Sequence, residues 1–482
     1  MQQQDPIAGA LAKDRLGAPS VVYFVLSAAA PLTVVAGVIT TAYAVTGITG
    51  LPIAFLVVGV VLAIFSVGYV AMARHMANAG AFYTYISRGL GRPFGIAGAW
   101  VALVAYNSLQ VGLYGMFGVA FAPLIEQWTG AKVYWWVLSL VAWLLVALLG
   151  VMRVDINGRV LAILLTVEVA AILLFDLADI ANPGPEGLSV STLAPSALAT
   201  EGVGALLVLA TLGFVGFESS VVFSEESRNP RRTVPTATYA SVAIIAILYA
   251  LSSWGMTVAT GPSKIVEVAR HDQAETIFNL ATAHLGGVVV DIARVLFVTS
   301  VFAAMISFHN TTARYFFALG RERVLPGVFG RTLPRSGAPL VGSLVQSALG
   351  LIVIVVWAVF GLDPLVQLFF YGGSFGGFGV LTLIFVTSIA IVVFFVRQPS
   401  GESALRRFVA PVPAVILLGI MLWLGISNFD VMLGVPAGDP LAWILPLVYA
   451  GVAVLGFGWA LILRAGSPSV YSLVGMGAKA GT

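Results

Sequence analysis

Twelve apolar stretches of about twenty residues or more constrain the fold of this chain more than any other feature. An α-helix rises about 1.5 Å per residue, so about twenty apolar residues cross the roughly 30 Å hydrocarbon core of a bilayer. The stretches cover residues 20–46, 51–73, 94–124, 133–152, 158–180, 202–224, 236–260, 287–318, 339–361, 364–396, 408–427 and 440–464. Hydrophobic residues make up 59% of the 482 residues and charged residues only 9%, against roughly 45–50% and 25% in soluble proteins. We therefore predict an all-α polytopic protein with about twelve transmembrane helices in a lipid bilayer.

Positive charges fall on alternate connecting segments, which tests the number of spans. If the N-terminus is cytoplasmic, that side holds all but four of the 24 Lys and Arg residues. Lys132, Lys264 and Arg270 fall on the other side, and Arg294 falls within a span. The segment between the fifth and sixth spans is acidic, and we assign to it Asp176, Asp179, Glu186 and Glu201. Because cytoplasmic loops carry excess Lys and Arg, we predict that both termini are cytoplasmic.

Several functional classes are excluded by what the sequence lacks. The chain has no cysteine, which excludes disulfides, thiol catalysis and cysteine-bound metals. Its net charge of +3 is small and scattered, so we expect no nucleic-acid partner. It contains no Walker loop, zinc-binding His-Glu pair or serine nucleophile elbow. We expect no enzymatic activity, no cofactor and no metal site.

Two of the spans contain residues that interrupt a membrane helix. Residues 209–220 read LATLGFVGFESS, which places two glycines and Glu218 in a segment otherwise suited to lipid. Glycine weakens a helix by roughly 1 kcal/mol relative to alanine, and a charge at the bilayer centre costs roughly 2.5 kcal/mol or more. In the first span residues 30–37 read APLTVVAG, and Pro31 either breaks the helix or kinks it against a neighbour. Interruptions five spans apart are typical of a transporter with two inverted repeats.

Three motifs, in order along the chain, resemble those of one transporter family. Residues 80–92 read GAFYTYISRGLGR, which resembles the Gly-Gly-x-Tyr-x-Tyr-x-x-Arg-x-x-Gly loop of the amino acid–polyamine–organocation (APC) superfamily. Residues 216–232, GFESSVVFSEESRNPRR, resemble the family's sixth helix and the loop after it. Residues 310–326, NTTARYFFALGRERVLP, resemble the segment that leaves its eighth helix. With the span count, these motifs cover nearly the whole chain.

The resemblance implies a LeuT-like fold and secondary transport by alternating access. The expected domains are an N-terminal cytoplasmic tail (1–19), a transporter core (20–396), helices 11 and 12 (397–464) and a C-terminal cytoplasmic tail (465–482). Two inverted five-helix repeats, about 20–180 and 202–396, make up the core, with helices 1 and 6 broken. The outer segment from Pro262 to Leu285 is amphipathic and predicts a short pair of lid helices.

In transporters of this kind, backbone groups of the two broken helices hold the charged groups of the substrate, helped by the helix dipoles. Three polar residues of the third span lie within one turn of each other and either line the site or bond neighbouring helices. The expected substrate-binding residues are Thr33, Val34, Gly37, Tyr106, Asn107, Gln110, Gly213, Phe214, Gly216 and Phe217. The first helix lacks the Gly-Ser-Gly-like run of many amino acid transporters, which leaves an amine or polyamine as an alternative substrate.

Four residues are candidates for coupling or gating. By resemblance, Glu168 in the fifth span occupies a place where some proton-coupled relatives carry a lysine. A buried carboxyl group favours its neutral form, so Glu168 is predicted to bind and release a proton, or else to be structural. Glu218 is predicted to gate or organise helix 6, and Tyr371 begins a glycine-rich patch suited to a gate. A sodium site would need hydroxyls such as that of Ser300, but no carboxylate accompanies them in sequence, so a proton is preferred.

We predict a proton-coupled permease of the plasma membrane that moves amino acids by alternating access. One alternative is an amine or polyamine permease or exchanger of the same fold. A second alternative, from a different functional class, is an ion channel. Broken helices at matched positions favour the transporter.

Overall fold

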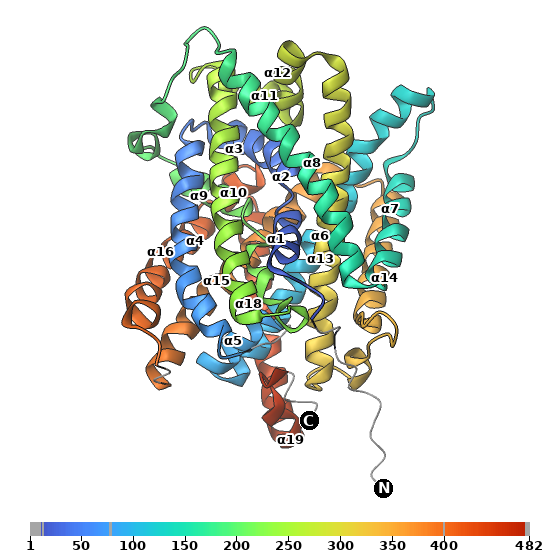
Figure 1. The fold of residues 1–482 in the computed structure, drawn as a ribbon, viewed down its shortest axis with the longest axis vertical. Coiled ribbons are helices and arrows are strands. Elements are labelled where there is room, and N and C mark those ends of the chain that lie inside the picture. Colours follow the sequence, from blue (N-terminus) through green and yellow to red (C-terminus); the bar gives the residue numbers. More distant parts are fainter. Residues whose placement is uncertain (1–10, 12–13, 77–79, 399–400, 478–482) are drawn as a thin grey trace.

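The computed structural model describes residue 11 and residues 14–76, 80–398 and 401–477, without the side chains of residues 155–157. Within these residues the protein is all-helical, and eleven helices are long and apolar enough to cross a membrane (Figure 1). Their bounds lie within a few residues of the predicted stretches. The helical bundle is confirmed, whereas the inverted repeat remains a prediction.

The helices begin and end where proline and glycine require it. Helix α10 begins at Pro230 and α16 at Pro411, because proline is suited to a first turn that needs no N–H partner. Helix α14 ends before Gly361, which has a φ of 62° and terminates the helix in the left-handed conformation.

The helices of the first half are α1 (Ala18–Ala29), α2 (Pro31–Thr33), α3 (Thr40–Thr46), α4 (Leu51–Ala73), α5 (Ala81–Gly89), α6 (Arg92–Thr129), α7 (Trp135–Gly150), α8 (Val154–Ala181) and α9 (Val203–Leu212). Those of the second half are α10 (Pro230–Thr260), α11 (Ile265–Asp272), α12 (Thr276–Leu285), α13 (Gly287–Arg321), α14 (Leu340–Phe360), α15 (Tyr371–Arg397), α16 (Pro411–Ser427), α17 (Phe429–Leu433), α18 (Leu441–Gly466) and α19 (Pro468–Leu473).

The fourth predicted span is shorter than expected. Residues 133–152 were expected to cross the bilayer, but helix α7 covers only the 16 residues Trp135–Gly150. About 20 residues are needed to span the hydrocarbon core, so α7 is an apolar helix of less than full span length. The expectation of about twelve full spans is therefore corrected to eleven in the described residues.

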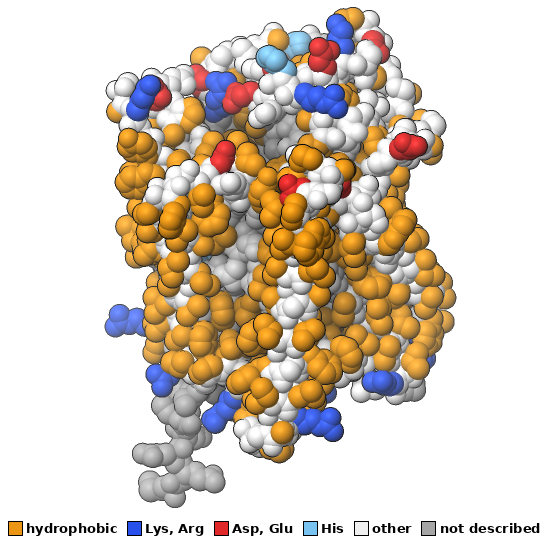
Figure 2. All heavy atoms as spheres, turned by 180° about the vertical axis from the view of Figure 1, so that it is seen from behind, with side chains coloured by type: hydrophobic (Ala, Val, Ile, Leu, Met, Phe, Trp, Pro, Cys, Tyr) orange, Lys and Arg blue, Asp and Glu red, His pale blue; other side chains and the backbone are white. Residues whose placement is uncertain are grey.

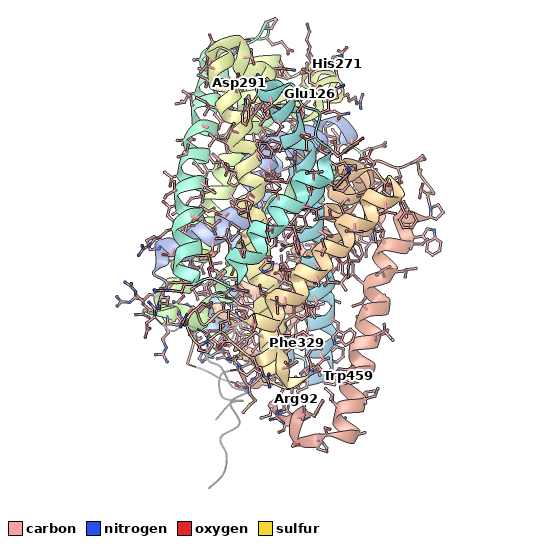
Figure 3. The ribbon with its side chains drawn as sticks, turned by 90° about the vertical axis from the view of Figure 1, so that its right-hand side faces the viewer. Arg92, Glu126, His271, Asp291, Phe329 and Trp459 are labelled. Carbon is pink, nitrogen blue, oxygen red and sulfur yellow. The ribbon has the colours of Figure 1, made fainter. Side chains whose placement is uncertain are left out.

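The surface has an apolar band with charged groups toward both ends. Figure 2 shows hydrophobic side chains around the middle, with only Lys and Arg visible among the charged groups at the lower end. Many exposed side chains of the protein are large and apolar, for example Ile163, Val454 and Leu455. Such exposure suits a lipid environment. The end that carries α5 and α19 is the one predicted to be cytoplasmic, and the end with α11 and α12 is the predicted outer end (Figure 1). Arg92 lies at the former end, and Glu126 and Asp291 lie at the latter (Figure 3).

Two short helices cover the predicted outer end. The segment from Pro262 to Leu285 forms α11 and α12, as its amphipathic pattern predicted. Helix α11 packs on α3, and α12 packs on α8 and α13. The Arg270 side chain donates a hydrogen bond to the Ala44 carbonyl at 2.8 Å, which ties α11 to the end of the first span.

One part of the charge assignment is wrong. Asp176 and Asp179 were assigned to an acidic outer loop, but both lie inside α8, and each side chain is only 2% exposed. The helix continues to Ala181, and its last two turns pack against other helices of the bundle.

Candidate functional site

The first break separates α1 from α2. Helix α1 ends at Ala29, and Ala30 has a φ of 46° and a ψ of 69°, a left-handed conformation that is uncommon outside glycine. Pro31 follows and has no N–H to continue the helix. The Ala29 carbonyl, freed by the break, accepts a hydrogen bond from the Tyr249 hydroxyl at 3.1 Å. A π-helical segment, η1 (Val34–Ile39), then leads into α3.

The second break follows α9. Helix α9 ends at Leu212, and the chain turns through Gly213 to Gly216 before a 3₁₀ helix, η4 (Phe217–Val221). Gly216 has a φ of 112°, and a Cβ atom added there would lie 2.6 Å from the Ala28 Cβ. Only glycine suits this position, because a positive φ disfavours any residue with a side chain and because the second break contacts the first one here, at Ala28. Both interruptions predicted from the sequence are therefore present.

A cavity of about 110 Å³ lies beside the two breaks. The side chains of its wall are apolar apart from the hydroxyl groups of Thr33, Thr41 and Ser374, and none of its lining residues is charged. The residues from the broken helices are Ala28, Ala29, Ala30, Thr33, Val34, Gly37, Val38, Thr41, Leu209, Leu212 and Val215. Most of them belong to α2, η1, α3 and α9, which lie nearer to the α11–α12 end than α1 does (Figure 1). The cavity thus lies mainly on the predicted outer side of the breaks.

Three of the predicted substrate-binding residues, Thr33, Val34 and Gly37, line this cavity. Thr33 also begins a chain of hydrogen bonds that leaves the cavity. Its hydroxyl lies 3.3 Å from the Ser300 Oγ, and the Ser300 hydroxyl donates to the Glu168 Oε1 at 2.7 Å. Because Ser300 has one hydroxyl hydrogen and donates it to Glu168, Thr33 is the donor to Ser300.

Glu168 lies behind the first break, on α8. Its side chain is 1% exposed, and its Oε1 also accepts a hydrogen bond from the Leu32 N–H at 2.6 Å. Leu32 is the second residue of the half-helix that begins at Pro31, so the carboxylate sits where the positive end of the helix dipole favours an anion. Sequence reasoning found no carboxylate to accompany Ser300, and this is corrected by the contact with Glu168. Both hydrogen bonds of Glu168 in the described part of the chain end on the same oxygen.

Glu218 lies within the second break and is bonded differently. Its Oε2 accepts from the Gly216 N–H at 2.9 Å, and its Oε1 accepts from the Tyr106 hydroxyl at 2.6 Å. The Glu218 carbonyl oxygen accepts from the Tyr69 hydroxyl at 2.9 Å. Each carboxyl oxygen therefore has its own donor, and Tyr106, predicted to bind substrate, is occupied by Glu218. Neither residue lines the cavity.

The two predicted amides of α6 also lie outside the cavity lining. Asn107 Nδ2 donates to the Leu103 carbonyl of its own helix at 2.6 Å. Gln110 is fully buried, and its Nε2 lies 3.4 Å from the Tyr114 hydroxyl. In this conformation the side-chain amides of both residues bond within α6, so these contacts match neither predicted alternative, which were lining the site or bonding a neighbouring helix.

The remaining predicted residues flank the cavity. Gly213 packs against Phe55 and Tyr249, and the Phe214 ring lies 6.4 Å from that of Phe55. Phe217 is buried against Phe65 at 6.2 Å between ring centroids. Tyr371 begins α15 and is partly exposed, next to lining residues of the same turn.

Sequence reasoning did not place in the site the part of the wall that comes from α6, α13 and the start of the tenth span, although Gly373 and Ser374 belong to the glycine-rich patch predicted to suit a gate. The residues of this part are Leu109, Leu113, Ala304, Phe308, Phe369, Phe370, Gly373 and Ser374. Phe369 and Phe370 end a second π-helical segment, η8 (Pro364–Phe370). π-Helical turns are frequent at functional sites, but their presence is not readable from an apolar sequence. Leu109 and Leu113 are four residues apart and so lie on one face of α6. Many apolar pairs in this sequence have the same spacing, so it does not mark these two as cavity residues.

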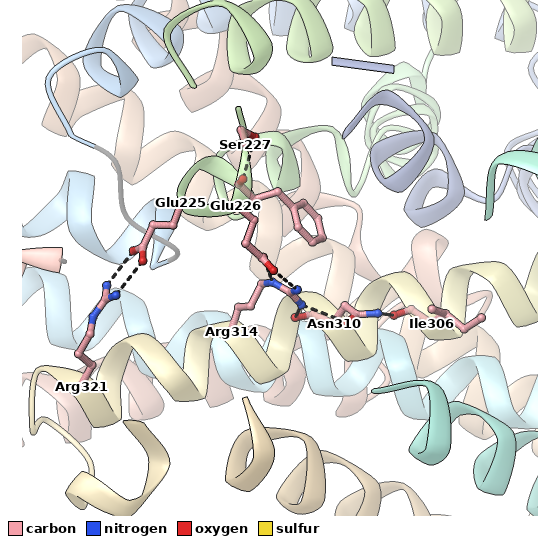
Figure 4. A network of polar contacts seen from close by, with 8 residues as sticks. Glu225, Glu226, Ser227, Ile306, Asn310, Arg314 and Arg321 are labelled. Atoms are coloured by element: carbon pink, nitrogen blue, oxygen red, sulfur yellow. Dashed lines mark hydrogen bonds and ion pairs between the residues drawn. The ribbon is translucent and has the colours of Figure 1, made fainter. Parts of the chain in front are cut away.

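An ion-pair network closes the bundle on the opposite side of the breaks (Figure 4). The Arg314 guanidinium contacts the two Glu226 oxygens at 2.6 and 3.0 Å and also bonds the Asn310 carbonyl and side chain. Both ionic side chains are 2% exposed. Arg321 pairs with Glu225 in the same bidentate way, at 2.7 Å for each contact. The network joins the segment that follows the second break to α13.

The N-terminal residues reinforce this closure. The backbone N–H groups of Arg15 and Leu16 donate to the Glu226 carbonyl at 2.9 and 3.0 Å, and the Arg228 N–H donates to the Leu16 carbonyl at 2.9 Å. The segment before α1 therefore pairs with the same turn that carries Glu226.

The chain is similar to known proteins over almost its whole length. The family described as amino acid permease matches residues 20–463. A methylthioribose transporter of Bacillus subtilis is 23% identical over 407 residues, which cover 80% of this chain and 82% of that protein. The branched-chain amino acid permease BcaP of the same organism is 24% identical over 398 residues, covering 79% and 81%. The low-affinity putrescine importer PlaP of Escherichia coli is 21% identical over 383 residues, covering 77% and 79%.

Proposed function

Because the chain belongs to the amino acid permease family, we propose that it is a proton-coupled secondary transporter of a neutral amino acid with an apolar side chain. The substrate would occupy the cavity beside the two breaks, in a multi-pass membrane protein with eleven candidate spans. The hydrogen-bonded chain from Thr33 through Ser300 to Glu168 carries this proposal, because it links the cavity wall to a buried carboxyl group. Interruptions in the first and sixth spans support alternating access by two inverted repeats.

The uncharged wall of the cavity supports a neutral side chain. The ammonium and carboxylate groups of an amino acid would contact backbone groups of the breaks, and its side chain would contact the apolar side chains of the wall. A diamine would place two cations against a wall with no acidic side chain, and an unpaired buried charge costs several kcal/mol or more. Putrescine is therefore the weaker candidate, although one relative is a putrescine importer by name. Methylthioribose, named for another relative, is uncharged and compatible with the same wall.

The arrangement of Glu168 supports a proton as the coupling ion. With two donors on Oε1, the other oxygen is the place for a proton. Neutralisation would remove the anion from the start of the α2 half-helix and weaken its electrostatic hold on the first break. A substrate that bonds Thr33 would draw its hydroxyl from Ser300 and so disturb the same carboxyl group. Binding of proton and substrate would thus act on one element, which is the requirement for coupling.

Uptake into proteoliposomes tests the proposal. The panel would contain labelled leucine, alanine, lysine, putrescine and methylthioribose, each with an imposed proton gradient, an imposed sodium gradient or none. We expect accumulation of a neutral amino acid that requires the proton gradient. Accumulation of lysine or putrescine alone would contradict the substrate, and dependence on sodium alone would contradict the ion. Equilibration without accumulation under every gradient would favour a channel, because a channel cannot concentrate its substrate.

A further inference from the structure

Helix α8 carries two further buried acids beyond Glu168. Asp176 and Asp179 are each 2% exposed and lie three residues apart, so both occupy one face of the helix. The elements packed on α8 are α1, α2, α10, α12 and α13, and no Lys, Arg or His of the described residues forms an ion pair with either aspartate. Two neighbouring carboxyl groups therefore lie inside the bundle without a counter-charge.

Their hydrogen bonds leave this pair incompletely satisfied. The Ser252 hydroxyl of α10 donates to the Asp176 Oδ2 at 2.9 Å. The Asp179 Oδ1 is buried and has no hydrogen-bond partner in the described part of the chain. On α10, Gly255 faces both residues, because a Cβ added there would lie 3.6 Å from atoms of each. Two buried carboxylates on one helix face with no counter-charge disfavour double ionisation, so we expect the pair to hold a proton or a cation.

The composition of the pair favours a proton over a metal ion. Two carboxyl groups and one hydroxyl supply too few ligands for a hard cation such as Ca²⁺, which takes about six to eight oxygens. No third acidic or histidine residue joins them in a metal-binding group within the described residues. A proton shared between two carboxyl groups needs no further ligand, as in paired-carboxylate sites generally.

The pair lies on the same face of α8 as Glu168. Positions 168, 172, 176 and 179 follow the spacing of one helix face, and all four side chains are buried. Asp176 lies eight residues from Glu168, a rise of about 12 Å toward the predicted outer end. Tyr249, one turn before Ser252 on α10, donates its hydroxyl hydrogen to the Ala29 carbonyl at the first break. Polar groups therefore follow the α8–α10 interface from its outer end to the break.

We propose that Asp176 and Asp179 form a proton-binding pair at the outer end of α8 that supplies protons to Glu168. A proton from the outer solution binds the Asp179 carboxylate and passes to Asp176, and the hydroxyl groups of Ser252 and Tyr249 on α10 pass it on to Glu168, each accepting one proton as it releases its own. Each transfer breaks one O–H bond as the next one forms, so each aspartate returns to its initial state. The relay rests on the proposed coupling through Glu168, whereas the protonation of the pair does not.

Transport by Asp176→Asn and Asp179→Asn tests the relay. Both variants should lower the initial rate of proton-driven uptake severalfold and leave exchange of labelled substrate at equal pH unchanged, because exchange needs no net proton movement. Asp291→Asn is the matched control, since Asp291 is a partly exposed acid of the same end that lies 3.6 Å from Arg294. Unchanged proton-driven uptake in both aspartate variants would overturn the relay while leaving the Glu168 coupling intact. A wild type that ignores the proton gradient would overturn both.

Infrared spectroscopy of the purified protein tests the proton-binding pair without transport. At neutral pH the wild type should show the C=O stretch of a protonated carboxyl group, and this band should be lost or shifted in Asp176→Asn and Asp179→Asn but retained in Asp291→Asn. Retention of the signal in a Glu168→Gln background would assign it to the pair. Identical spectra for the wild type and both aspartate variants would overturn the pair. Appearance of the band only after sodium removal would indicate a cation site instead and would also overturn it.

Discussion

Glu168 and Glu218 are both buried beside a broken helix, yet they are held in different ways. Glu218 is part of the second break, and its two carboxyl oxygens accept from two different donors, Gly216 and Tyr106. Glu168 stands on α8 and contacts the first break from outside, with both of its donors, Leu32 and Ser300, on one oxygen. A proton on Glu218 would displace a donor, whereas a proton on the second oxygen of Glu168 would not.

This difference shows that the role of an ionisable residue in a membrane span is indicated by its hydrogen-bond partners and not by its depth in the membrane. Glu218 bonds residues that hold one turn in shape, one of them two residues away in sequence. The Glu168 contacts join α8 to α2 and, through Ser300, to α13. The first arrangement suits a structural role, and the second suits a switch that moves helices relative to one another.

The largest expected effect is that of Glu168→Gln. For one proton per substrate, a gradient of one pH unit can drive about tenfold accumulation, and the variant should show none. It should still fold and still exchange substrate, because the glutamine carbonyl can accept both donors in place of Oε1. Accumulation under a proton gradient, measured beside exchange at equal pH, checks both parts. Glu218→Gln is the matched control and should keep its response to the gradient. Loss of the gradient response in both variants would contradict the proposed difference in role between Glu168 and Glu218.

Gly216→Ala should destabilise the second break most. A left-handed conformation costs a non-glycine residue about 1–2 kcal/mol, and overpacking against Ala28 adds about 1–3 kcal/mol. Thermal unfolding of the detergent-purified protein should show a Tm several degrees lower than the wild type. An unchanged Tm would mean that the contact between the breaks does not hold them in place.

Tyr106→Phe should separate stability from coupling. It removes the hydroxyl that donates to Glu218, which leaves a buried carboxyl oxygen unsatisfied at a cost of about 1–3 kcal/mol. The accumulation ratio under a proton gradient should stay the same. Tyr114→Phe, on the same helix, removes only a weak 3.4 Å contact with Gln110 and should cost less. If Tyr106→Phe abolished the gradient response and left the Tm intact, Glu218 would be the coupling residue instead.

Gly37→Ala should have the smallest effect and act on the cavity alone. Gly37 lines the cavity, and a Cβ atom added there meets no other atom within 4 Å. One additional methyl group in a hydrophobic pocket changes discrimination by about 1–3 kcal/mol. We expect weaker uptake of the bulkiest substrate, little change for the smallest, and a wild-type Tm. Competition assays with amino acids of increasing size check this, and equal losses for all sizes would argue that substrate does not reach Gly37.

The spans and both breaks could be predicted because each depends on local chemistry. Apolar length defines a span, and Pro31 and Gly216 disfavour a continuous helix wherever they stand. The shortness of α7 is the exception, since residues at the ends of its apolar stretch lie outside the helix.

The contacts within the site could not be predicted, because they depend on how distant segments pack. Ser300 and Glu168 are 132 residues apart in sequence, and no pattern indicates that they meet. The same holds for Phe308 and Phe369, which are two phenylalanines among 29 until packing places them on the cavity wall. Asp176 and Asp179 were assigned to an acidic outer segment from the distribution of charge along the chain, and only the fold shows that they are buried.

Substrate-driven proton movement tests the central claim, that Glu168 carries the coupled proton, most directly. A pH-sensitive dye would be enclosed in proteoliposomes with no imposed gradient, and substrate would then be added outside. We expect the interior of wild-type vesicles to acidify as substrate enters, and vesicles with Glu168→Gln to show no pH change while they still exchange labelled substrate. Acidification by the Glu168→Gln variant at the wild-type rate would contradict the account and make Glu168 a structural residue.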